Sequence, residues 1–507
     1  MAGGAGTIGG LALLLVAAPL GAVAWRAGGL ALSPADLAAL RFTLLQAALS
    51  ALVSVGLAVP VARALARRRF PGRALLITVM GAPFLLPVIV AILGLLAIFG
   101  RGGVLNTALA AAGLPVLSVY GLQGVVLAHV FLNLPLATRM ILQGWQAIPA
   151  ERFRLAASLG FTPADSFRHL ERPMLIQILP GAAATVFAIC LTSFAVALVL
   201  GGGPRATTLE LAIYQAVRFE FDLRHAAGLA LVQTALGGLA TLAAWALARR
   251  AGFGAGLDRA LPLAAPGGWR QGVDGAVLAL AAAFLLAPLA AILASGAPGL
   301  LQLPDQVWPA AVRSVAVALV SALMTVGVAL VLAEARAAGR LGWVELAAML
   351  PLATSGLVLG TGLFLIVQPF VPPMILALPV TVLVNMLLSL PFAYRLILPE
   401  AQALQADYGR LAAALGLVGL ARLRLLTLPR LARPLGFAAG LAAALSMGDL
   451  GVIALFAGER EATLPLVVQR LAAAYRNEAA AGTALLLVGL SFALFWAFDA
   501  GGRRAAA

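Results

Sequence analysis

Residues 42–65 read FTLLQAALSALVSVGLAVPVARAL, and Arg63 is the only charged residue among them. A helix needs about 20 mostly apolar residues to cross the ~30 Å hydrocarbon core of a bilayer, so this stretch predicts a membrane-spanning helix. The whole chain has the same character, since 63% of its 507 residues are hydrophobic and 10% are charged. Soluble domains have about 25% charged residues. The sequence therefore predicts an integral membrane protein.

Apolar stretches of this length recur along the chain and predict an all-α fold with about twelve transmembrane helices. The expected spans are 8–27, 42–65, 74–100, 122–143, 178–201, 225–248, 273–296, 312–334, 343–368, 374–397, 433–457 and 479–498.

The distribution of arginine predicts the orientation in the membrane. The chain contains no lysine, so all 34 of its cationic residues are arginines. Of these, 24 lie in the C-terminal tail and in the loops at 63–73, 139–172, 249–270, 336–340 and 395–433. Because cytoplasmic loops are enriched in basic residues, we expect these loops and both termini to be cytoplasmic. Glu210, Glu220 and Asp222 are assigned to an outer loop.

Two segments of the first half recur in the second half. Ser50–Gly56 (SALVSVG) matches Ser321–Gly327 (SALMTVG) at an offset of 271 residues. Arg154–Gly160 (RLAASLG) matches Arg410–Gly416 (RLAAALG) at an offset of 256 residues. Chance similarity between Ala- and Leu-rich helices could produce the first match. It explains the second match less well, because there a polar loop keeps its length and its glycine. The matches therefore indicate an internal duplication.

The duplication divides the chain into two transmembrane domains of six spans each. Because six is an even number, the second copy has the same orientation as the first, as in parallel repeats related by an axis along the membrane normal. We expect the first domain to comprise residues 1–248 and the second to comprise residues 273–507. The Gly-, Pro- and Arg-rich stretch at 249–272 is typical of a cytoplasmic linker.

Several classes of function are disfavoured by the composition. Without lysine, the chain cannot form a standard Walker A loop or a lysine Schiff base. The single cysteine, Cys190, excludes an internal disulfide and a multi-cysteine metal site. His129, His169 and His225 are far apart in sequence and are expected at membrane interfaces rather than in a metal site. The net charge of +15 would suit nucleic acid, but the basic residues lie between apolar spans, so we expect no nucleic-acid partner.

The loop between spans 4 and 5 of each half is long and amphipathic. In the first half, residues 150–159 suit a helix, and Gly160 is a natural C-terminal stop. Thr162 followed by Pro163 predicts the start of a second short helix with Thr162 as its N-cap. Pro173 is expected to end that helix before the chain re-enters the membrane. Such an elbow would offer a partner a compact surface, although basic amphipathic helices also lie on membrane surfaces.

The glycine and proline of these loops have the same 13-residue separation in both halves, in Gly160…Pro173 and Gly416…Pro429. In this spacing, and in the aliphatic residues before the prolines, the loops resemble the EAA loop of binding-protein-dependent ABC transporter permeases. The resemblance covers nearly the whole chain and implies a type I importer fold with two fused transmembrane domains. The leading Glu of the family loop is replaced by Arg154 and Arg410 here, so the salt bridge of that Glu is not carried over.

The resemblance also implies how the chain acts. It would be a non-catalytic permease of the bacterial inner membrane that couples to a separate ATP-binding cassette ATPase, in two copies. A periplasmic binding protein would deliver a small-molecule substrate. ATP and Mg²⁺ would be bound by the ATPase, and this chain would carry no cofactor. The implied coupling residues are Arg154, Ala156, Ala157, Gly160 and Pro173, with Arg410, Ala412, Ala413, Gly416 and Pro429 in the second loop.

A narrower resemblance concerns the substrate. Residues 192–222, 446–456 and 463–465 are similar to thiamine permeases of this family, which implies transport of thiamine or its phosphates. Double-length ferric iron permeases share the general layout and remain the alternative. An ion-coupled secondary transporter would need membrane-buried acids or histidines, of which the sequence offers few. A membrane-embedded enzyme would need a nucleophile and a base, and no such set stands out.

Asp449 is the acidic residue of greatest interest because it falls within the predicted span 433–457, beside Gly448 and Gly451. Acids within spans are costly and usually face a cavity or a partner. Thiamine is a cation, so a carboxylate near its path is reasonable, but Asp449 could instead cap a helix break made by the two glycines. The matched position in the first half is Ser193, so an acidic contact would be one-sided. Both residues are candidates for the translocation path.

Overall fold

The computed structural model describes residues 2–28, 32–80, 86–203, 206–248, 268–339 and 342–506. Every regular element in these ranges is a helix, which confirms the predicted all-α fold. In the first half the helices are α1 (Ala2–Ala27), α2 (Pro34–Arg67), α3 (Arg73–Val79), α4 (Val88–Phe99), α5 (Val104–Ala111), α6 (Leu122–Ala147), α7 (Ala150–Ser158), α8 (Pro163–Ser166), the π-helical turn η2 (Phe167–Glu171), α9 (Arg172–Leu191), α10 (Phe194–Leu200), α11 (Leu209–Gln215), the π-helical turn η4 (Ala216–Glu220) and α12 (Leu223–Ala248).

In the second half they are α13 (Trp269–Gly299), η5 (Leu300–Gln302), α14 (Val307–Ala337), α15 (Val344–Met349), η6 (Leu350–Ala353), α16 (Gly356–Val367), η7 (Pro373–Leu376), α17 (Ala377–Ala414), α18 (Gly419–Arg422), the π-helical turn η8 (Leu423–Thr427), α19 (Leu428–Met447), α20 (Gly451–Phe456), α21 (Leu464–Ala473) and α22 (Asn477–Ala505).

The number of membrane-length helices agrees with the prediction of about twelve. Eleven of the described helices are long and apolar enough to cross a membrane, or twelve if one bent pair counts as a single span. Apolar side chains can face lipid on the outside of such a bundle, whereas backbone polar groups must be paired within the chain, which a helix achieves by itself.

The third predicted span of each half, 74–100 and 343–368, is broken rather than straight. In the first half α3 ends at Val79, and α4 begins nine residues later at Val88. In the second half, Val344–Ala353 and Gly356–Val367 meet at a bend of 100°. The apolar pattern of the sequence continues across both breaks. Because hydropathy depends on composition and not on backbone dihedral angles, it predicted one continuous span at each place.

Several corresponding elements have the same length in both halves. α4 and α16 each contain 12 residues, α9 and α19 each contain 20, and η2 and η8 each contain five. The halves differ where α17 runs unbroken for 38 residues, whereas α6 and α7 are separate helices in the first half.

The first helix of each half packs against the other half. α1 contacts α14, α15 and α16, while α13 contacts α2 and α4. Small residues allow these close approaches: a Cβ atom built on Gly94 of α4 would lie 2.7 Å from the carbonyl oxygen of Pro288 in α13. α13 begins at Trp269, within the predicted linker 249–272, and residues 249–267 lie outside the described ranges.

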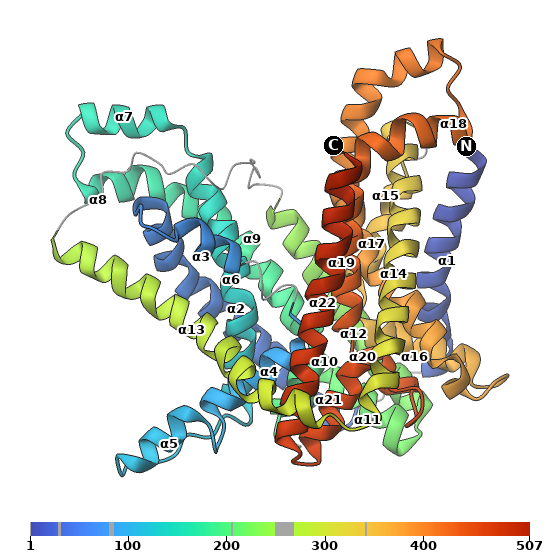
Figure 1. The fold of residues 1–507 in the computed structure, drawn as a ribbon, viewed down its shortest axis with the longest axis horizontal. Coiled ribbons are helices and arrows are strands. Elements are labelled where there is room, and N and C mark those ends of the chain that lie inside the picture. The colour runs from blue at the N-terminus through green and yellow to red at the C-terminus, as the bar shows by residue number, and fades with distance from the viewer. Residues whose placement is uncertain are drawn as a thin grey trace.

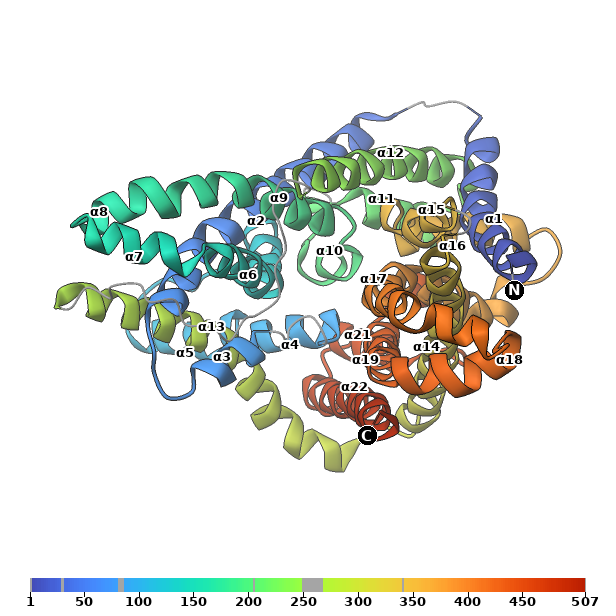
Figure 2. The same ribbon diagram turned by 90° about the horizontal axis from the view of Figure 1, so that it is seen from above.

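The two loops that match in sequence lie at the same end of the helix bundle. We call residues 150–171 loop A and residues 406–427 loop B. The start of α1 and the end of α22 are at this end too, whereas α5, α11 and α21 are at the opposite end (Figure 1). Seen from above, the end of α4 of the first half lies beside α19 and α21 of the second half (Figure 2).

Candidate functional site

Loop A ends its first helix, α7, with a Schellman motif. Gly160 has a φ of +70°, a left-handed conformation that costs a residue with a side chain about 1–2 kcal/mol. The Gly160 N–H donates to the Ala157 carbonyl at 3.1 Å, and the Phe161 N–H donates to the Ala156 carbonyl at 3.0 Å. These bonds satisfy two carbonyls that the end of a helix leaves free. The predicted glycine stop is confirmed.

Loop B repeats this motif with the matching residues. Gly416 has a φ of +64°. Its N–H donates to the Ala413 carbonyl at 3.1 Å, and the Leu417 N–H donates to the Ala412 carbonyl at 2.8 Å. A Cβ atom on either loop glycine would meet no atom within 4 Å, so the backbone conformation alone favours glycine at both positions. The two elbows therefore have the same geometry.

The predicted coupling residues divide into a buried pair and an exposed set. The alanines Ala156 and Ala412 are buried against the rest of the chain. The exposed residues are Arg154, Ala157, Gly160, Pro173, Arg410, Ala413, Gly416 and Pro429. Each loop thus rests on one alanine and presents its arginine, its second alanine and its glycine outward.

Exposed leucines form a further part of both loops, which the sequence reasoning missed. Leu155 and Leu159 are 60% and 63% exposed, and the matching Leu411 and Leu415 are 54% and 64% exposed. Residues four positions apart lie on the same face of a helix, so each loop presents two leucines side by side. The same spacing in both halves was visible in the sequence and could have indicated an apolar docking face.

The second helix of loop A begins as predicted but does not end as predicted. The Thr162 hydroxyl accepts the Asp165 N–H at 3.2 Å, and the Asp165 carboxylate accepts the Thr162 N–H at 3.0 Å, which makes a capping box. The expectation that Pro173 ends this helix is wrong. Proline is tolerated in the first turn of a helix, where its missing N–H is not needed, and Pro173 lies in the first turn of α9. The elbow therefore continues into span 5 without a break.

Ser193 and Asp449 occupy corresponding breaks in span 5 of the two halves. Ser193 lies between α9 and α10 as the N-cap residue of α10. Asp449 lies between α19 and α20 rather than within a continuous helix. The backbone N–H groups of Gly451, Val452 and Ile453 in α20 face the Asp449 carboxylate. Its Oδ2 atom, however, has no hydrogen-bond partner among the described residues.

The structure brings these two breaks together between the halves. A Cβ atom built on Gly451 would lie 3.7 Å from Cδ1 of Phe194 and 3.9 Å from Cδ1 of Leu357. One built on Gly448 would lie 3.2 Å from Cα of Pro87. The starts of four short helices, α4, α10, α16 and α20, therefore meet beside Asp449. Interrupted helices near the middle of a membrane are where many transporters contact their substrates.

Glu210, which the sequence reasoning assigned to an outer loop, is a buried acid in a helix at that end of the bundle. It is 1% exposed in α11, and its Oε1 atom accepts a hydrogen bond of 2.9 Å from Gln233 Nε2. The Ser355 hydroxyl of the second half also contacts its carboxylate. Gln233 Nε2 donates in addition to the Leu191 carbonyl, at 2.8 Å, where α9 ends. Glu210 therefore lies close to the break in span 5, and its neighbours are visible only in three dimensions.

His129, which was expected at a membrane interface, is packed among the helices of the first half. It is buried in α6, and its Nδ1 atom lies 3.2 Å from the Ser50 hydroxyl of α2. Asn385, which matches His129, donates to the Ser446 hydroxyl of α19 at 2.9 Å rather than to Ser321, the match of Ser50. A polar contact between spans is thus kept in both halves. Among the described residues no group of three or more His, Cys, Asp or Glu side chains could hold a metal ion.

Two corresponding halves of membrane-spanning helices, with matching loops at one end and interrupted helices between the halves, define a multi-pass transport permease. The chain is 38% identical over 470 residues to the thiamine transport system permease protein ThiP of Brucella abortus (strain 2308), which covers 90% of this chain and 86% of that protein. The chain therefore belongs to the family of thiamine transport system permease proteins.

Further relatives agree with this membership. The match to the protein of the same name from Salmonella typhimurium is 39% identical over 480 residues and covers 90% of this chain and 87% of that protein. A shorter match of 201 residues, 31% identical, links the chain to the sulfate transport system permease protein CysT of Salmonella typhimurium, with 39% and 72% of the two chains covered. No family model matches the chain.

Proposed function

We propose that this chain is the permease subunit of an ATP-driven importer of thiamine or its phosphates in the bacterial inner membrane. It forms the path for the substrate, while ATP and Mg²⁺ are bound by a separate ATP-binding cassette ATPase. A periplasmic binding protein delivers the substrate to the end of the bundle that carries α5, α11 and α21. Loops A and B and both termini are then cytoplasmic.

The observation that carries this proposal is the pair of identical elbows. Gly160 and Gly416 end their helices with the same two hydrogen bonds, and each elbow presents two leucines to solvent. Exposed apolar side chains that recur at matching positions indicate a surface for another protein. Two such surfaces suit two copies of one ATPase, and the names of the relatives indicate the substrate.

The substrate part of the proposal is tested by uptake in cells. A strain that lacks this chain should lose uptake of labelled thiamine at low external concentration, and the restored gene should return it. Competition by unlabelled thiamine monophosphate and diphosphate would show which forms are accepted. Unchanged thiamine uptake with loss of ferric iron uptake would overturn the assignment in favour of a ferric iron permease.

The energy source is tested in proteoliposomes that contain the chain, its ATPase and the binding protein. Uptake should require ATP and should continue when ion gradients are collapsed by ionophores. Uptake driven by an ion gradient without ATP would identify a secondary transporter instead.

The docking part is tested by placing a charge on the exposed leucines. Leu155→Asp and Leu411→Asp should each weaken co-purification of the ATPase by about tenfold or more, because a carboxylate in an apolar contact loses its hydration. Leu114→Asp is a matched control, since Leu114 is 54% exposed after α5 at the opposite end of the bundle. Equal attachment in all three variants would refute docking through these leucines.

A further inference from the structure

Each loop is tied to the second helix of its own half at one corresponding place. In the first half, Arg63 of α2 donates to Glu171 at the end of loop A, from Nε at 2.6 Å and from Nη2 at 3.2 Å. At the matching positions of the second half, Thr427 of loop B donates from its hydroxyl to Glu334 of α14 at 3.0 Å. The offsets of 271 and 256 residues that relate the halves also relate these two pairs. Both halves therefore have a contact at this position, but the acid has changed sides: it is Glu171 of loop A in the first half and Glu334 of α14 in the second.

The tie in the first half is the stronger one. Two charge-assisted hydrogen bonds join Arg63 to Glu171, which is 2% exposed, and such bidentate pairs fix geometry as well as adding energy. The Arg63 guanidinium also lies over the ring of Phe167 in loop A, 4.9 Å from its centre. In the second half, Glu334 has the hydroxyl of Thr427 and a longer ion pair with Arg422 at 3.8 Å.

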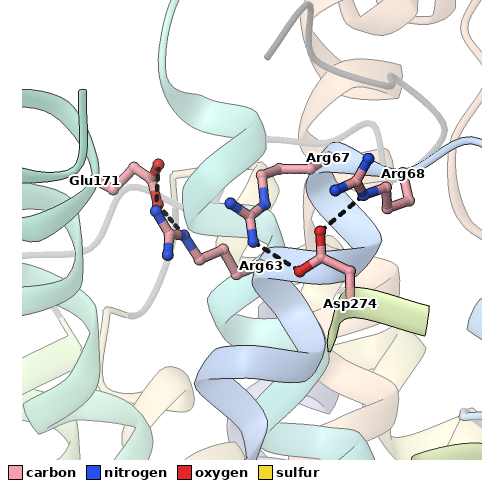
Figure 3. Close-up of polar contacts among 5 residues, drawn as sticks. All are labelled: Arg63, Arg67, Arg68, Glu171 and Asp274. Carbon is pink, nitrogen blue, oxygen red and sulfur yellow. Dashed lines mark hydrogen bonds and ion pairs between the residues drawn. The ribbon is translucent and has the colours of Figure 1, made fainter. Parts of the chain in front are cut away.

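The first tie also continues into the other half of the molecule. One turn beyond Arg63, Arg67 and Arg68 bind the two oxygens of Asp274, at 2.8 and 2.7 Å. Asp274 belongs to α13, the first helix of the second half. Figure 3 shows the two contacts side by side, with α2 between loop A and α13.

The two positions of the second half that match Arg67 and Arg68 cannot form this continuation. The residues that match Arg67 and Arg68 are Ala338 and Gly339, which have no group able to form an ion pair. A movement of loop A is therefore opposed by ion pairs that reach both halves. Among the described residues, no ion pair links loop B to the first half, and α14 meets that half by packing against α1.

We propose that Glu171, Arg63 and Asp274 are positioning residues that transmit a movement of loop A, through the end of α2, to the second half. The proposal rests on the function proposed above, in which the loops bind an ATPase. It makes the two loops unequal: loop A is linked to the other half by ion pairs with α13, whereas the described contacts link loop B to the other half through the packing of α14 against α1. Two identical ATPase copies would then have different effects on transport.

The test uses the full chain with its ATPase and binding protein in proteoliposomes. The readout is the ratio of hydrolysis stimulated by the loaded binding protein to basal hydrolysis, because a merely structural defect would lower both rates. Glu171→Gln should lower this ratio by about tenfold, since it leaves the half-buried Arg63 without its charge partner. The matched Thr427→Val, which removes one hydrogen bond, should lower it by less than about threefold.

Asp274→Asn tests the step between the halves. It should leave ATPase attachment unchanged, because Asp274 lies outside both loops, and still lower the stimulated ratio by about fivefold or more. An unchanged ratio in this variant would show that the ion pairs do not carry loop A's movement to the second half. Equal losses in Glu171→Gln and Thr427→Val would show that the two loops are equivalent, and either result would overturn the proposal.

The exchange variant R63E/E171T builds the pair of the second half into the first half. It should recover part of the ratio lost in Glu171→Thr alone, because the new hydroxyl can donate to the new carboxylate. If the exchange variant recovers none of the lost ratio, this contact has no role in coupling. The comparison still decides the question if Glu171→Gln fails to reach the membrane. If the wild-type chain binds no ATPase at all, the proposed function fails instead, which is a different result from any of these.

Discussion

Phe194 of the first half lies against Gly451 of the second half, where a Cβ atom would be 3.7 Å from the Phe194 ring. Ser193 precedes this phenylalanine, and Asp449 lies two residues before this glycine. The two chain breaks that the internal repeat relates, at Ser193 and Asp449, thus approach each other across the boundary between the halves. A cationic substrate that passed this boundary would meet the Asp449 carboxylate there.

Asp449→Asn should therefore lower uptake of labelled thiamine by about tenfold, because it removes a charge that acts in a region of low dielectric constant. Asp305→Asn is the control, since Asp305 is an exposed acid in the segment between α13 and α14. Uptake in proteoliposomes with equal amounts of each variant is the measurement. Full uptake by Asp449→Asn would mean that Asp449 caps the break between α19 and α20 and does not contact the substrate.

Glu210 should contribute to stability through its buried hydrogen bonds. Glu210→Leu removes the acceptor for Gln233 Nε2, and a buried polar group left without its partner costs about 1–3 kcal/mol. Glu210→Gln keeps an amide oxygen at that place and should cost less. The midpoint of thermal unfolding in detergent should fall clearly for the leucine variant and little for the glutamine variant. Equal midpoints would mean that these hydrogen bonds do not stabilise the folded chain.

Much of the fold could be predicted because a membrane demands long apolar helices, and composition alone shows those. The elbows could be predicted as well, since Gly160 and Thr162 act on the backbone within a few residues of themselves. Both features depend on local sequence. Local rules were also the source of one error, since Pro173 reads as a stop signal but occupies a first helical turn, where proline fits.

The remaining features depend on contacts between residues that are far apart in the chain. Glu210 has the sequence context of a loop acid, and its burial follows from the approach of Gln233 and of Ser355 from the other half. The pair of Arg63 and Glu171 spans 108 residues, and neither residue has a local signal for the other. Once the halves are aligned, however, Glu334 and Thr427 at the matching positions would have suggested a contact there.

The arginine distribution makes the orientation testable. Reporter fusions after Gly268 and at the C-terminus should read cytoplasmic, and a fusion after Gly202 should read periplasmic, because 24 of the 34 arginines lie on the side assigned to the cytoplasm. Alkaline phosphatase and a fluorescent protein would report the two sides. A periplasmic C-terminus would contradict the parallel arrangement of two six-span domains.

The elbow glycines give the sharpest test of coupling. Gly160→Val or Gly416→Val would force a β-branched residue into a left-handed conformation, at a cost of about 1–2 kcal/mol. This cost is local, since a Cβ atom at either position meets nothing within 4 Å. We expect each variant to insert into the membrane normally, to lose most co-purification of the ATPase and to abolish uptake.

Gly113→Val separates this effect from backbone strain in general. Gly113 has the same φ of +70° as Gly160, and a Cβ atom there would also meet nothing within 4 Å, but it follows α5 at the opposite end of the bundle. The conformational cost is thus matched, while the position relative to the ATPase is not. Gly113→Val should keep ATPase attachment and stimulated hydrolysis. If all three variants behave alike, whether all bind the ATPase or none does, the loops are not its docking elements.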